Sequence, residues 1–389
     1  MSVTAVRGFV AAGGSAGIKA SGAPDVAVVA TADGVAVSAA GVFTGNLAAA
    51  APVQISRKHL AATSGKAAAV ILTSGNANAA TGEPGRQAVL ALCQDVADGI
   101  GAKLEEVLAC QTGLIGIPFP IEVAGPAVPG IVSSRSADAQ SGAAAAVAIM
   151  TTDTVPKKVV VRGDGFTVGG MAKGAAMLAP NMATMLAVCT TDATVDPDTL
   201  RTCLQGAVAA SFNTMTVDGC TSTNDTVLVL ANGQGATPTP AALTAALTEA
   251  CLSLAEQMVA DAEGATKVAH IMVVGADSDV AAHTAARKVA ESQLVQCSLN
   301  GEDAYWGRII SELGSAGVAF DIDLVSVAYG GVVVCDGGVA VEHDAAAVTA
   351  HMQGRHVEIL CDLKLGSGRA AVLTTDLGYG YIDENRTTS

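Results

Sequence analysis

One threonine near the middle of the chain has the surroundings that an activated nucleophile requires. Thr184 stands between a segment rich in glycine and alanine, residues 169–183, and an apolar run, residues 185–189, that predicts a buried strand. A threonine hydroxyl is a weak nucleophile at neutral pH and needs an adjacent base. If the chain were cut before Thr184, the released α-amine, with a reference pKa of about 7.7 to 8.0, would supply that base within the same residue.

The rest of the sequence offers no obvious substitute for this group. The six histidines are scattered, and we find no G-x-S-x-G turn, dinucleotide fingerprint, phosphate loop or metal-binding cluster. A lone threonine at the head of a strand carries little information, however, because β-branched residues are ordinary in strands. On residue types alone, a plain strand residue is the commoner interpretation of Thr184.

The segment KGAAMLAPNMATML, Lys173 to Leu186, resembles the self-cleavage site of the ornithine acetyltransferase family, the bifunctional glutamate N-acetyltransferases of arginine biosynthesis. The similarity extends along most of the chain. Members of that family cut themselves at an Ala-Thr bond and use the new N-terminal threonine as the acyl acceptor. The resemblance therefore implies a cut between Ala183 and Thr184, giving fragments 1–183 and 184–389, with a C-terminal lobe in the second fragment from about residue 270.

Other short motifs match the same family. Thr112-Gly113 interrupts a short apolar strand and by itself is typical of a turn, but the resemblance makes the Thr112 hydroxyl and the Gly113 amide the oxyanion hole. Without the resemblance, the remaining matches would be a turn threonine, a surface lysine, a solvated carboxylate and a frayed tail. With it, they become substrate contacts at Thr151, Lys173, Thr184, Glu263, Asn385 and, at the last hydroxyl residue, Ser389 or Thr388.

The elements that must position these residues alternate between apolar strands and amphipathic helices. The early strands predict a sheet rather than a βαβ array, and residues 130–142 predict a surface connection. Strand patterns occur at 26–30, 35–39, 68–72, 185–189, 226–230, 268–274, 332–335, 339–341, 356–363 and 370–375. Helical patterns occur at 87–101, 143–150, 279–293 and 345–352, and Asp196-Pro197 and Thr239-Pro240 each predict a helix start. With the resemblance, this implies an α+β fold: a layered sandwich of β-sheets flanked by helices, the N-terminal-nucleophile-like architecture of the family, with a smaller C-terminal α/β lobe.

Composition restricts the class of protein. The chain has 389 residues, of which 50% are hydrophobic and only 3% aromatic, so a large core must be filled by Ala, Val, Leu and Met in close contact. A formal net charge of -15 opposes binding to nucleic acid or anionic membrane, and no apolar run is long enough to span a bilayer. Nine cysteines without paired spacing and an N-terminus unlike a signal peptide predict a cytoplasmic protein.

The resemblance implies a two-step acyl transfer. Thr184 takes the acetyl group of N2-acetyl-L-ornithine, L-ornithine leaves, and L-glutamate then accepts the group to give N-acetyl-L-glutamate. No metal or bound cofactor is expected, acetyl-CoA is a second donor in bifunctional members, and the cut fragments are expected to form a heterotetramer of two alpha and two beta chains. Two alternatives stay open: a self-processed N-terminal-Thr aminopeptidase or amidase, in which water replaces glutamate, and an uncut, non-catalytic amino-acid-binding protein.

Overall fold

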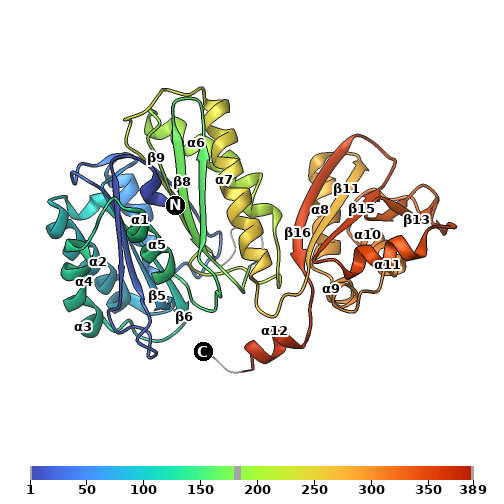
Figure 1. The fold of residues 1–389 in the computed structure, drawn as a ribbon, viewed down its shortest axis with the longest axis horizontal. Helices are drawn as coiled ribbons and strands as arrows, with labels where there is room; N and C mark the ends of the chain where they lie inside the picture. Colours follow the sequence, from blue (N-terminus) through green and yellow to red (C-terminus); the bar gives the residue numbers. More distant parts are fainter. Residues whose placement is uncertain (1, 179–184, 387–389) are drawn as a thin grey trace.

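The computed structural model describes residues 2–178 and 185–386, which form three β-sheets flanked by helices (Figure 1). The first two sheets lie face to face, and helices cover their outer faces. The third sheet forms a separate lobe, reached through the long helix α7 (Pro240–Ala260). This arrangement confirms the expected α+β sandwich of sheets flanked by helices.

The first sheet has four strands in the order β1-β2-β5-β6. Its strands are β1 (Phe9–Gly14), β2 (Val26–Thr31), β5 (Ala69–Asn76) and β6 (Val107–Leu114). The first two pairs run antiparallel, but β6 is parallel to β5, and α2 (Gly82–Ile100) connects the two. Within the first hundred residues β1, β2 and β5 pair antiparallel, as expected of a sheet rather than a βαβ array, and β6, which lies beyond them, completes a βαβ unit with β5 and α2.

The second sheet has six strands in the order β4-β3-β10-β9-β8-β7. Its strands are β3 (Val37–Phe43), β4 (Lys66–Ala67), β7 (Lys157–Arg162), β8 (Thr167–Lys173), β9 (Leu186–Thr191) and β10 (Thr226–Ala231). The antiparallel strands β8 and β9 pair directly from Val168 opposite Thr191 to Lys173 opposite Leu186. The segment that resembles a self-cleavage site therefore connects two neighbouring strands of this sheet.

The third sheet has six strands in the order β14-β13-β12-β15-β11-β16. Its strands are β11 (Val268–Ala276), β12 (Ser326–Tyr329), β13 (Val332–Asp336), β14 (Val339–Ala340), β15 (His356–Asp362) and β16 (Gly368–Thr375). Buried side chains of α8 (Asp279–Ala290), α9 (Gln293–Asn300), α10 (Trp306–Gly314) and α11 (Ala345–Gln353) share one core with it. A last helix, α12 (Tyr379–Glu384), leaves this lobe and runs back under α7 in Figure 1.

The remaining helices complete the layers. These are α1 (Ala51–Ala62), α3 (Ile121–Ala124), α4 (Val128–Ser133), α5 (Ala139–Ala148) and α6 (Pro197–Ala209), with short 3-10 turns at Val3–Ala5, Leu104–Glu106, Gly125–Ala127 and Phe212–Thr214. The expected surface connection at 130–142 is shorter, residues 134–138, because α4 buries Ile131 and Val132 in the first core and α5, capped by the carboxylate of Asp138, begins four residues earlier than expected.

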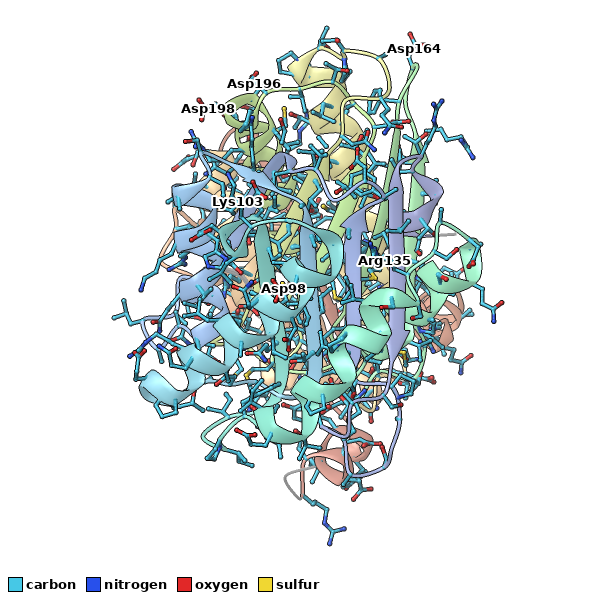
Figure 2. All side chains as sticks on the ribbon, turned by 90° about the vertical axis from the view of Figure 1, so that its left-hand side faces the viewer. Asp98, Lys103, Arg135, Asp164, Asp196 and Asp198 are labelled. Carbon is cyan, nitrogen blue, oxygen red and sulfur yellow. The ribbon has the colours of Figure 1, made fainter. Side chains whose placement is uncertain are left out.

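Apolar side chains fill the spaces between the layers. One core lies between the first sheet and α2 and α4, a second lies between the two sheets, and a third lies between the second sheet and α6 and α7. Many charged side chains lie on the outside, as the labelled Asp98, Lys103 and Asp164 show in Figure 2, but several, including Lys173 and Asp225, are buried. In the described part of the chain, no helix is long and apolar enough to cross a membrane.

Candidate active site

The bond between Ala183 and Thr184 lies outside the described residues, but the chain on each side of it is held by a carboxylate. Upstream, the amides of Met177 and Leu178 donate to Asp218 at 2.5 and 3.1 Å. Downstream, the amide of Met185 donates to Asp225 Oδ1 at 3.0 Å, and the Met185 carbonyl accepts from Thr226 N–H at 3.1 Å. Both flanks of the segment are therefore fixed by residues that follow the Ala183–Thr184 bond in the chain.

Asp225 is fully buried, and it is a functional candidate that sequence reasoning missed. Its Oδ2 atom has no hydrogen-bond partner among the described residues. Burial raises the pKa of this carboxyl well above its usual range, although the Met185 amide and the Lys173 ammonium oppose the change. The sequence signal was slight: an aspartate directly before a buried strand, in a polar loop with several other candidates.

The predicted oxyanion hole lies at the end of β6. Thr112 is buried, and Gly113 follows it with a φ of 129°, a conformation that favours glycine. A Cβ atom at Gly113 would lie 2.3 Å from the carbonyl carbon of Gly75 and 2.5 Å from the amide nitrogen of Asn76, where the β5–β6 register is irregular. This close approach of two backbones leaves room only for glycine.

Lys173 contacts two other predicted site residues, Thr151 and Thr112. It is the last residue of β8, it is 3% exposed, and its Nζ donates to Thr151 Oγ1 at 2.6 Å and to Thr112 Oγ1 at 3.4 Å. Burial lowers the pKa of this lysine, and the nearby carboxylate of Asp153 opposes the change. The structure thus places a buried ammonium group beside the two threonines, at the point where the chain enters the cleavage segment.

Glu263 and Asn385 meet beside Ala175, at the upstream end of the segment. The Glu263 amide donates to the carbonyl of Ala175 at 2.9 Å, and its carboxylate accepts from Asn385 Nδ2 at 2.7 Å. Asn385 follows α12, whose Tyr381 packs so closely on Gly264 that a Cβ there would lie 2.2 Å from the Tyr381 amide nitrogen. The tail up to Asn385 is therefore docked at the site, whereas Thr388 and Ser389 lie outside the described residues.

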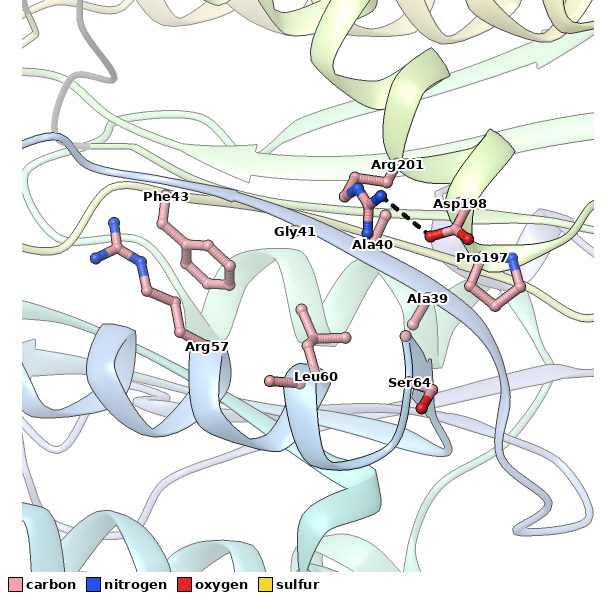
Figure 3. A pocket seen from close by; sticks show the side chains of 12 residues that line it. Ala39, Ala40, Gly41, Phe43, Arg57, Leu60, Ser64, Pro197, Asp198 and Arg201 are labelled. Atoms are coloured by element: carbon pink, nitrogen blue, oxygen red, sulfur yellow. Dashed lines mark ion pairs between the residues drawn. The ribbon is translucent and has the colours of Figure 1, made fainter.

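A cavity of about 420 Å³ lies elsewhere, between α1, β3 and α6 (Figure 3). Arg57, Phe43, Leu60 and Arg201 are among its lining residues, and none of the predicted site residues lines it. Within the described ranges, no group of three or more His, Cys, Asp or Glu side chains is arranged to hold a metal ion. The candidate site itself offers threonine hydroxyls, one buried ammonium group and buried carboxylates.

Comparisons with known proteins agree over the whole chain. The ArgJ family model matches residues 10–387. The arginine biosynthesis bifunctional protein ArgJ of Thermobifida fusca is 46% identical over 388 residues, and that of Streptomyces coelicolor is 45% identical over 387 residues; each alignment covers 99% of both chains. A crystal structure of ornithine acetyltransferase complexed with ornithine, from Mycobacterium tuberculosis, is 45% identical with a TM-score of 0.44, covering 46% of this chain and 94% of that chain.

Proposed function

This chain belongs to the ArgJ family, and from that premise we infer that it is the acyltransferase of arginine biosynthesis that moves an acetyl group from N2-acetyl-L-ornithine to L-glutamate. The observation that supports the chemistry best is the meeting of Thr112, Thr151 and Lys173 beside the paired ends of β8 and β9. These two strand ends flank the segment that contains the family's cleavage motif.

In the proposed maturation step, the chain cuts itself between Ala183 and Thr184. The upstream amides donate hydrogen bonds to Asp218, and the Met185 amide donates one to Asp225; these bonds support this step, because they hold both flanks of the segment. The cut converts the Thr184 amide into an α-amine, which serves as the base for the hydroxyl of the same residue.

In the proposed transfer step, Thr184 Oγ attacks the acetyl carbonyl and L-ornithine leaves. The Thr112 hydroxyl and the Gly113 amide stabilise the negative oxygen of the tetrahedral intermediate, a role in which one donor contributes about 2.7 to 4 kcal/mol. L-glutamate then attacks the acetyl-threonine, and the α-amine of Thr184 takes up the proton that the attacking amine releases. Both half-reactions use the same hydroxyl, so one pocket receives the two amino acids in turn.

Charge complementarity supports the proposed substrate contacts. Lys173 offers a buried cation to a substrate carboxylate, with Thr151 hydrogen-bonded to it. Glu263 offers an anion to the δ-ammonium of ornithine, and Asn385 orients that carboxylate. The last hydroxyl contact is Ser389 or Thr388.

We further propose acetyl-CoA as a second donor, two alpha and two beta chains as the assembly, no bound cofactor, and the cytoplasm as the location.

The deciding experiment gives the enzyme N2-acetyl-L-ornithine without glutamate and measures the mass of the fragment that begins at Thr184. We expect that fragment to gain one acetyl group and to lose it when glutamate is added. Turnover without any adduct would contradict the covalent route. Release of free acetate at an undiminished rate without glutamate would favour the amidase alternative, and a chain of intact mass with no turnover would favour a non-catalytic binding protein.

A further inference from the structure

Four buried side chains of alternating charge run from the candidate site into the protein: Lys173, Asp153, Lys157 and Asp261. Lys173 Nζ lies 3.8 Å from Asp153 Oδ2, and Lys157 Nζ lies 2.6 Å from Asp153 Oδ1 and also pairs with Asp261. The side chains of Asp153 and Lys157 are fully buried, and those of Lys173 and Asp261 are 4% and 8% exposed. Two positive and two negative charges balance, which buried ions require.

One end of this ion-pair chain fixes the backbone beside Lys173 and Thr151. Asp153 Oδ2 accepts a hydrogen bond from the Thr151 amide at 2.9 Å, and Asp153 Oδ1 accepts one from the Gly174 amide at 2.8 Å. A single carboxylate thus sets the backbone of Thr151 and of the residue that follows Lys173. Lys173 and Thr151 are then hydrogen-bonded to each other.

The other end reaches across the proposed cut. Asp261 accepts hydrogen bonds from the amides of Thr154 and Val155 at 2.9 and 3.2 Å. It therefore fixes the end of the loop 151–155, whose start is held by Asp153. Asp261 follows α7 and precedes Glu263 by two residues. The chain of charges therefore connects Lys173, on the fragment before the cut, to the position of Glu263, on the fragment after it.

We propose that Asp153 and Lys157 are positioning residues that hold the substrate contacts of the two fragments in register and keep Lys173 positively charged in its buried position. This inference rests on the proposed function, since it assigns Lys173 and Glu263 to the substrate. Neither Asp153 nor Lys157 touches the reacting atoms; each acts through a neighbour. An ionised Asp153 between two ammonium groups is what makes a charged Lys173 compatible with burial.

The test follows from the charges that face Lys173. These are the carboxylates of Asp153, Glu263 and Asp225 and the ammonium groups of Lys157 and Lys19. Asp153→Asn removes one negative charge and leaves two neighbouring ammonium groups without a shared anion. Lys173 then loses its proton at lower pH, and the cation that binds the substrate carboxylate is lost with it.

We expect Asp153→Asn to raise KM for N2-acetyl-L-ornithine about tenfold or more, and to move the basic limb of the kcat/KM profile to lower pH. Asp261→Asn should produce the same displacement to a smaller extent, because this carboxylate is further from Lys173, and it serves as the test if Asp153→Asn does not fold. Asp336→Asn, in an exposed pair with Lys364 at 2.5 Å on the C-terminal lobe, is the control and should change neither quantity.

The inference is overturned if the folded variants unfold at lower temperature but keep the wild-type KM and basic limb, because the ion-pair chain would then be purely structural. The proposed function fails separately, if the wild-type enzyme transfers no acetyl group. Wild-type transfer together with an unchanged profile in the variants would therefore reject the inference and leave the function in place.

Discussion

At the scale of single residues, Gly113 is constrained twice, by its positive φ and by the backbone of β5. Gly113→Ala is expected to lower the free energy of unfolding by about 2 kcal/mol or more and to abolish acetyl transfer, because the added Cβ displaces the amide that we propose for the oxyanion hole. Gly116→Ala is the matched control: it also has a positive φ, 81°, but nothing lies within 4 Å of an added Cβ. Urea unfolding and kcat of both variants test this. Equal losses of stability and kcat in the two variants would show that the positive φ alone, and not the close contact with β5, causes them.

Thr184 carries the sharpest prediction at this scale. Thr184→Ala removes the hydroxyl, so we expect the purified protein to run as one uncut chain on a denaturing gel and to transfer no acetyl group. Thr184→Ser keeps a hydroxyl and should still be cut, more slowly. Normal two-fragment processing of the alanine variant would contradict the assigned nucleophile.

Asp225 should couple stability to pH. Because burial raises its pKa, the folded protein binds this proton more tightly than the unfolded chain, and stability is lost as the pH rises above the usual carboxyl range. Asp225→Asn, which stays neutral, is expected to be more stable than wild type at neutral pH by on the order of 1 kcal/mol, and no more stable at about pH 3. Urea unfolding at both pH values measures the difference. A less stable variant at neutral pH would mean that the contacts of the ionised carboxylate outweigh its burial.

At the scale of elements, α12 is held by polar contacts and contributes no buried side chain of its own. Ending the chain after Gly378 removes Tyr381 and Asn385, so Glu263 loses the amide that orients its carboxylate. We expect KM for N2-acetyl-L-ornithine to rise about tenfold while the unfolding temperature falls by only a few degrees. Asn385→Ala alone should reproduce most of the rise in KM. A wild-type KM in the truncated enzyme would exclude the tail from the site.

Local signals explain which elements the sequence could predict. The Asp196-Pro197 and Thr239-Pro240 signals are confirmed as the starts of α6 and α7, because an N-cap side chain and a proline at the first position act within one turn. The early start of α2 and the whole of α4 were missed, since glycine and proline in their first turns are also typical of loops. Their helical state depends on apolar faces that pack on the first sheet.

The candidate site also contains residues that local motifs identified and residues that depend on distant partners. Motif resemblance identified Thr112, Thr151 and Lys173, and the structure brings these three together. Asp153 and Asp225 were missed because their importance comes from partners far away in the sequence. No pattern around a lone aspartate shows that it will be buried between two lysines or beside a cleavage segment.

At the scale of the whole molecule, both proposed fragments contribute to the second sheet. Strands β3, β4, β7 and β8 precede the cut and β9 and β10 follow it, so β9 pairs with β8 on one side and with β10 on the other. We expect the cut protein to elute as one species in native buffer and to separate into two pieces in denaturant. Each piece alone should fail to refold, because each would expose half a sheet. Circular dichroism of the separated pieces tests this, and a native spectrum from either one would contradict it.

The hydrogen bonds of Asp225 and Thr226 to Met185 also determine when the chain can cut itself. Both residues come roughly forty positions later in the chain than the bond to be cut, so a growing polypeptide has no working cleavage geometry until β10 has been made and added to the sheet. Cutting then depends on one molecule's own fold, and its rate should not change when the protein is diluted. Cleavage thus takes place only in a correctly folded chain. A chain that misfolds in this region never acquires the reactive α-amine of Thr184.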